Sequence, residues 1–132
     1  MKRLFSVLLF TALSLSAQPP EGRLIDSIQG PDLYKSYCSV CHGSDAKGTG
    51  SMAKSLKTIP ADLTRIATRN GGKFPRPRLE GIISGTQPML KGHGTKEMPV
   101  WGPIFSQVTR DQDLGRVRID NLARYLESIQ VK

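Results

Sequence analysis

The sequence predicts a small all-α domain of short helices joined by long loops, and three observations lead to this prediction. The chain has 132 residues, about the size of one domain. Apolar residues recur at helical spacing in several short segments, and no stretch shows the sustained alternation typical of a strand. The 13 Gly and 9 Pro residues supply many turns and helix ends for so short a chain.

Residues 1–17 have the layout of a signal peptide. Two basic residues, Lys2 and Arg3, precede an apolar run that extends to residue 15, and small residues follow as far as Ala17. The run is shorter than the roughly 20 residues that span a membrane, so we expect cleavage near Ala17. Residues 18–29 are then a linker and residues 30–132 the folded domain, located in the periplasm or elsewhere outside the cytoplasm.

The helices are expected in the following order. Pro31 suits the first turn of a helix, and Asp32 is favourable near its positive end, so a helix should start at Gly30 and run to about residue 42. Residues 43–60, rich in Gly, Ser and Thr, are expected to form a loop.

Three further helices are expected after this loop. Apolar residues at helical spacing predict a short helix over residues 61–70, and a second over about residues 76–84. The longest helix should begin near Asp111. Its expected apolar face consists of Leu114, Val117, Leu122, Tyr125, Leu126 and Ile129.

The only cysteines, Cys38 and Cys41, belong to the motif Cys-Ser-Val-Cys-His that ends at His42. C-x-x-C-H is the attachment pattern of c-type haem. Its two thiols lie about one helical turn apart, which suits the two vinyl groups on one edge of the porphyrin. His42 would then bind iron and donate its other ring N–H to a backbone carbonyl, for which Pro60 is our choice. The motif predicts one covalently bound haem c and its iron.

Three other interpretations of the cysteines compete with haem attachment. They are a disulfide of an exported protein, a thioredoxin-like redox pair and a zinc site completed by His93. None of them explains why His42 follows Cys41 directly, and these adjacent side chains do not point easily at one tetrahedral ion. We therefore favour haem.

The candidates for the second iron ligand are Met52, Met89, His93 and Met98. Met98 is favoured because Pro99 restricts its backbone and preorganises the loop. Met89 is less favoured because it fits a surface loop equally well, and His93 lies between glycines in a flexible turn. Ligation by His and Met predicts a higher reduction potential than ligation by two histidines.

The sequence resembles the class I (mono-haem) cytochromes c over about residues 30 to 130. The resemblance rests on the haem motif, on the closing helix and on residues 98–102, which are similar to the Met-Pro-x-Trp-Gly ligand loop of some bacterial cytochromes c. It implies an all-α bundle of short helices wrapped around one covalent haem.

The resemblance also implies that the first and last helices cross. Members of the family place a glycine and an aromatic residue before the first haem cysteine where Gly30 and Tyr34 stand here. Their last helix carries an apolar residue and an aromatic residue, which Leu122 and Tyr125 resemble. A glycine at the crossing lets two helices approach closely.

The net charge of +8 indicates a basic surface. This surface either serves solubility alone or attracts an acidic redox partner or an anionic membrane face. Nucleic acid is not an expected partner, because the Lys and Arg residues are scattered and only 6% of residues are aromatic. Lys47 and Lys54 are candidates for a ring of lysines around an exposed haem edge.

The expected function is that of a one-electron carrier, not of an enzyme. Two alternatives stay open at this point. One is a peroxidase-like haem enzyme whose sixth ligand, Met98, is displaced. The other is an electron-entry subunit of a larger oxidoreductase complex.

Overall fold

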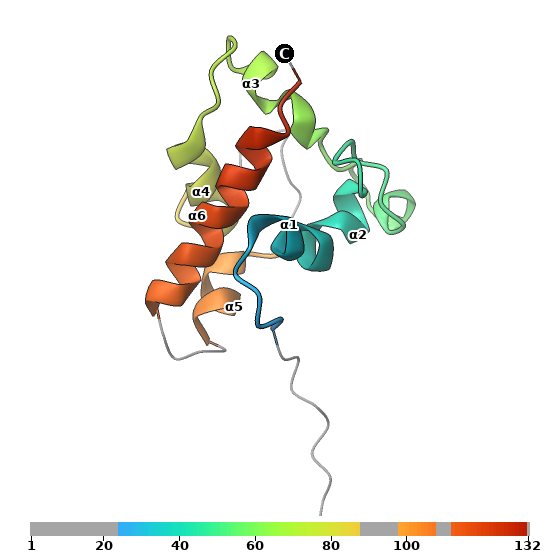
Figure 1. Cartoon of the computed structure of the whole chain (residues 1–132). Helices are drawn as coiled ribbons and strands as arrows, with labels where there is room; N and C mark the ends of the chain where they lie inside the picture. The colour runs from blue at the N-terminus through green and yellow to red at the C-terminus, as the bar shows by residue number, and fades with distance from the viewer. Residues whose placement is uncertain (1–23, 88–97, 108–111, 132) are drawn as a thin grey trace, which may run out of the picture.

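The computed structural model describes residues 24–87, 98–107 and 112–131, which form helices, turns and loops without a strand (Figure 1). The predicted all-α class is therefore confirmed, whereas the predicted signal peptide lies outside these residues. In chain order the helical elements are α1 (Gly30–Leu33), a π-helical turn (Tyr34–Cys38), α2 (Ser39–His42), 3₁₀ turns (Ala53–Ser55 and Leu63–Arg65), α3 (Ile66–Arg69), α4 (Arg76–Ser84), α5 (Trp101–Gln107) and α6 (Gln112–Ser128).

The first helical run extends from Gly30 through the cysteine motif, as predicted, but it is not a uniform α-helix. A π-helical turn joins α1 to α2, and the N–H of Ser39 bonds to the carbonyl of Tyr34, five residues earlier. Such a turn holds one residue more than an α-turn and rotates the residues that follow it about the helix axis. Here the Tyr34 hydroxyl donates to the Gly43 carbonyl at 2.6 Å, and the Tyr37 hydroxyl accepts from the Ile25 N–H at 2.7 Å.

The predicted crossing of the first and last helices is confirmed. A Cβ at Gly30 would overlap the Asn121 carbonyl oxygen and lie 2.7 Å from the Tyr125 Cβ. The rings of Tyr34 and Tyr125 pack with their centroids 5.4 Å apart. Asn121 also donates from Nδ2 to the Ile28 carbonyl at 2.9 Å. Glycine is therefore required sterically where α1 meets α6.

The buried face of α6 differs from the predicted face at one turn. Val117 is 39% exposed, so its assignment to the apolar face was wrong, while the neighbouring Arg118 is only 4% exposed. The reason is that Val117 lies five residues before Leu122, off the stripe that i, i+3 and i+4 spacing produces. The buried residues of this stripe are Gly115, Arg118, Ile119, Leu122, Ala123 and Leu126.

Helices α4 and α5 both pack against α6 (Figure 1). The α4 boundaries agree with the predicted residues 76–84, and Gly85 ends the helix in the left-handed conformation at φ 81°. A Cβ at Gly102 would overlap the Ser84 carbonyl oxygen, so the start of α5 lies directly on the end of α4. Arg76 pairs with Glu127 and lies 3.5 Å from Asp120, which ties α4 to α6.

Candidate functional site

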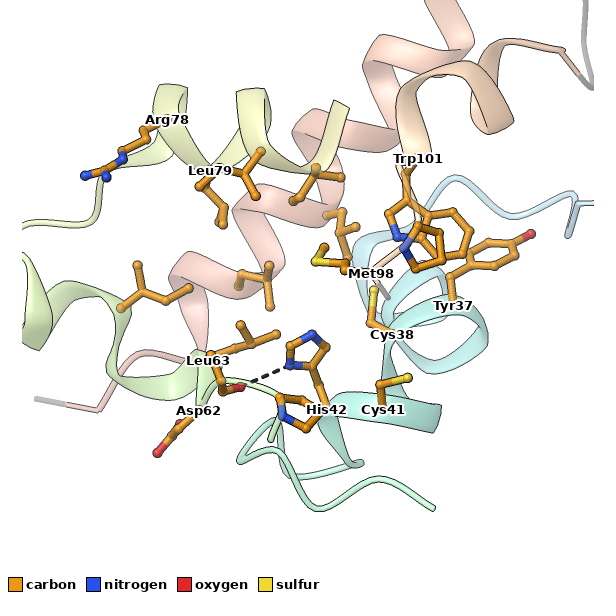
Figure 2. Close-up of a pocket in the computed structure, with 18 of the residues that line it drawn as sticks. Tyr37, Cys38, Cys41, His42, Asp62, Leu63, Arg78, Leu79, Met98 and Trp101 are labelled. Atoms are coloured by element: carbon orange, nitrogen blue, oxygen red, sulfur yellow. Dashed lines mark hydrogen bonds between the residues drawn. The ribbon is translucent and has the colours of Figure 1, made fainter. Parts of the chain in front are cut away.

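A cavity of about 550 Å³ lies between α2, the 56–66 segment, α4, the start of α5 and α6 (Figure 2). Its walls are mainly apolar. The principal apolar side chains are Leu56, Leu63, Ile66, Leu79, Ile83 and Leu122. Such a cavity suits a large apolar ligand held by a few polar groups.

Cys38 and Cys41 both line this cavity from the end of the first helical run. Their thiols are not joined in a disulfide. Burial, followed by the nearby Cys41 thiol, raises the pKa of Cys38 to about 12. Both sulfurs lie on the same side of the cavity (Figure 2), as attachment to one edge of a porphyrin requires.

The His42 imidazole projects into the cavity, and its Nδ1 lies 3.0 Å from the Ala61 carbonyl oxygen (Figure 2). A carbonyl oxygen only accepts, so Nδ1 carries the proton and Nε2 keeps the lone pair that a metal needs. Burial lowers the pKa of His42, an effect that the hydrogen bond to Ala61 opposes. The choice of Pro60 as hydrogen-bond partner was wrong by one residue, because the Pro60 carbonyl faces Gly48 instead.

Met98 lines the same cavity as His42, although the two residues come from distant parts of the chain. Figure 2 shows the Met98 side chain beside Trp101, with its sulfur directed toward the space above the imidazole. Met52, by contrast, is 46% exposed and is not part of the cavity wall. The other two candidate ligands, Met89 and His93, lie outside the described residues.

The cavity also has a polar end, which sequence analysis missed. Arg78 lies far from Cys38 and Cys41, at the opposite side of the cavity (Figure 2). The sequence of α4 could have predicted this polar end. Leu79, Ile82 and Ile83 lie on one face of the helix, and Arg78 lies beside that face. These three apolar residues and Arg78 all line the cavity.

These features fit a haem. The thiols suit its vinyl edge, the apolar walls suit the porphyrin, and Arg78 provides positive charge where the propionate carboxylates of the opposite edge would lie. An all-α fold with a C-x-x-C-H helix facing such a cavity defines a c-type cytochrome.

Comparison with known families agrees with this class. The model of the family described as cytochrome c oxidase, cbb3-type, subunit III matches residues 27–126, and the chain belongs to this family of cytochrome c domains. No curated protein and no solved structure matches the chain. The protein therefore carries covalently bound haem c with its iron, and its function is electron transfer. Among the helices of the described residues, none is long and apolar enough to cross a membrane.

Proposed function

We propose that the protein is an exported one-electron carrier whose haem is attached through Cys38 and Cys41 and whose iron is ligated by His42 and Met98. The observation that carries this proposal is that one cavity collects all four side chains. When bound, the haem supplies a metal centre that accepts and releases single electrons. The mainly apolar cavity walls would surround the porphyrin, and the fold would hold both ligands in place.

Each of the proposed residues has a distinct role. Cys38, at the end of the π-helical turn, and Cys41, in α2, tether the group next to His42. His42 offers its neutral Nε2, because the bond from Nδ1 to Ala61 fixes the tautomer and the ring orientation. Met98 offers a neutral thioether, which favours reduced iron more than a second imidazole does.

The proposed location is the periplasm or another extracytoplasmic compartment. Residues 1–17 are the proposed signal peptide, residues 18–29 a linker and residues 30–132 the cytochrome c domain. The family match covers residues 27–126 and so includes most of the proposed cytochrome c domain. Haem attachment to a C-x-x-C-H motif is also typical of exported proteins.

The proposed partners are redox proteins with an acidic docking surface. Ile59 lines the cavity and is 80% exposed, so the cavity reaches the protein surface at this loop. A partner docked there would lie close to the haem. Lys54 and Lys57 are exposed on the same loop, and Lys47 is exposed on the loop that follows α2. The same positive charge would also favour peripheral association with an anionic membrane face.

A second candidate function is that of an electron-entry subunit in a larger respiratory complex. The description of the matching family, subunit III of a cytochrome c oxidase, favours it. The two functions share the same haem site and differ in the lifetime of the interface. A carrier is expected to purify as a monomer, whereas a subunit is expected to copurify with its complex.

The haem-loaded protein provides the test. We expect a potentiometric titration to follow a one-electron curve, and electron exchange with an acidic partner such as a flavodoxin to slow as salt is added. An exchange rate that does not depend on salt would contradict acidic docking. Catalytic turnover of peroxide by the unsubstituted protein, accompanied by loss of the Met98–iron bond, would favour the peroxidase-like enzyme over the carrier.

A further inference from the structure

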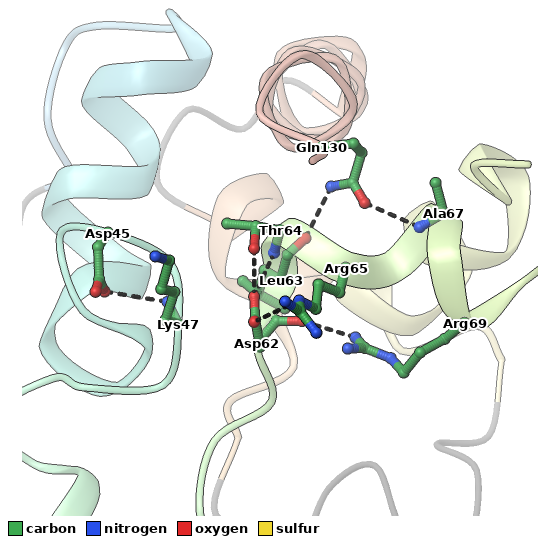
Figure 3. Close-up of polar contacts among 9 residues, drawn as sticks. All are labelled: Asp45, Lys47, Asp62, Leu63, Thr64, Arg65, Ala67, Arg69 and Gln130. Atoms are coloured by element: carbon green, nitrogen blue, oxygen red, sulfur yellow. Dashed lines mark hydrogen bonds and ion pairs between the residues drawn. The ribbon is translucent and has the colours of Figure 1, made fainter. Parts of the chain in front are cut away.

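Gln130, just after α6, is bonded to the segment of residues 63–67, which follows Ala61 in the chain (Figure 3). The Gln130 side chain accepts from the Ala67 N–H at 2.9 Å and donates to the carbonyls of Leu63 at 2.8 Å and Leu126 at 2.6 Å. One amide thus joins the last turn of α6 to both ends of the 63–67 segment. We call Gln130 and this set of bonds the C-terminal clamp.

Further hydrogen bonds hold the residues that follow Ala61. The Leu63 N–H donates to the Ala46 carbonyl at 2.7 Å, and the Val131 N–H donates to the Thr64 carbonyl at 2.9 Å. The Asp62 side chain accepts from the Thr64 N–H at 2.8 Å. Together with the Gln130 bonds, these contacts connect the backbone next to Ala61 with the chain that follows α6.

Gln130 does not line the cavity, so it can affect His42 only through this wall. Of its three bonds, the donation to the Leu63 carbonyl acts nearest to Ala61. A carboxylate or an apolar side chain of similar size would lose this bond, because neither can donate a proton.

We propose that Gln130 is a positioning residue for the axial imidazole: by bonding to the Leu63 carbonyl it keeps the Ala61 carbonyl against the Nδ1–H of His42. This inference rests on the proposed function, in which His42 is an iron ligand. A firm Nδ1–H···O bond raises the electron density of the imidazole and so stabilises oxidised iron. Loss of the clamp should weaken that bond and raise the reduction potential.

The test compares three variants of the haem-loaded protein. Gln130→Met removes all three bonds, and Gln130→Glu keeps the acceptor for the Ala67 N–H but removes both donors. Ser128→Ala is the control, since among the described residues its hydroxyl bonds only to the Tyr125 carbonyl at the same helix end, at 2.7 Å. The two measurements are the reduction potential and the solvent exchange rate of the His42 Nδ1 proton, observed by NMR in the reduced state.

We expect both Gln130 variants to raise the potential and to speed proton exchange several-fold, and Ser128→Ala to match the parent. A lowered potential would instead indicate entry of water into the site and would overturn the proposal. Parental values in both Gln130 variants, with haem and Met98 ligation intact, would overturn it as well. If Gln130→Met does not accumulate, Gln130→Glu decides the matter alone. A parent without covalent haem would refute the proposed function instead.

Discussion

The imidazole of His42 donates from Nδ1 to the Ala61 carbonyl oxygen across 3.0 Å. This bond joins the end of α2 to the opposite wall of the cavity. It fixes the ring plane and leaves Nε2 free to bind a metal. The proposed ligation by His42 thus depends on how the Ala61 wall is held, as well as on the cysteine motif.

Replacement of Met98 by Ala should change the iron coordination. We expect Met98→Ala to abolish the thioether-to-iron absorption band of the oxidised protein and to lower the reduction potential, because a neutral sulfur ligand that favours reduced iron is lost. Optical spectroscopy and a redox titration measure both effects.

Met52→Ala is the matched control, because Met52 is half exposed and lies outside the cavity wall. It should leave the band and the potential unchanged. Retention of the band in Met98→Ala, together with its loss in Met89→Ala, would reassign the ligand to Met89.

Gly30→Ala should destabilise the helix crossing. The added Cβ would overlap the Asn121 carbonyl oxygen and press on the Tyr125 Cβ at 2.7 Å. Because backbone atoms must move, we expect a loss of about 1–3 kcal/mol in the free energy of unfolding. Chemical denaturation of the haem-loaded protein measures it. The exposed Ser36→Ala in the same helical run should change stability little, and equal effects of the two substitutions would refute the steric argument.

Arg118→Met should stabilise the protein. Arg118 is 4% exposed, and within the described residues its Nε and one terminal nitrogen lack a hydrogen-bond partner. Its other terminal nitrogen makes only a long contact of 3.4 Å with the Ile25 carbonyl. Unsatisfied buried donors cost about 1–3 kcal/mol, so an apolar chain of similar length should raise the unfolding free energy by a comparable amount. Arg116→Met, at an exposed position of α6, is the control, and a destabilised Arg118→Met would show that the guanidinium has a favourable role.

The Asp62 carboxylate should make stability depend on pH in the acid range. Hydrogen bonds from the hydroxyl and N–H of Thr64 lower the pKa of Asp62. A lowered folded-state pKa contributes stability that is complete above the unfolded value, roughly 3.9, and is lost as pH falls through the folded value. The midpoint temperature of thermal unfolding should therefore fall less between neutral and acid pH for Asp62→Asn and for Thr64→Val than for the parent. The same pH dependence in all three proteins would contradict this assignment.

Much of the site follows from local sequence. The spacing of Cys38, Cys41 and His42 sets their geometry on one helical run, and the Pro after Met98 favours an extended backbone at Met98. In both features neighbouring residues determine the outcome. The crossing of Gly30 with Tyr125 was predicted by the resemblance to the class I cytochromes c and not by local spacing.

Other features depend on contacts between distant segments. The Pro60 carbonyl lies against Gly48, from a different loop, and the Ala61 carbonyl is the one that faces His42. The bonds of Gln130 to the 63–67 segment require that α6 end beside it. Burial of Arg118 contradicts the usual preference of arginine for solvent. No local pattern in the sequence encodes these three outcomes.

Detection of covalent haem shows directly whether Cys38 and Cys41 attach the cofactor. The full chain would be expressed with c-type haem maturation machinery, together with Cys38→Ala, Cys41→Ala and the double variant, and each would be stained for haem after denaturing electrophoresis. We predict a haem-positive band at the size of the parent chain and no haem on the double variant, because only these two thiols can form thioether bonds. A parent protein that retains no haem under these conditions would show that this chain is not a c-type cytochrome.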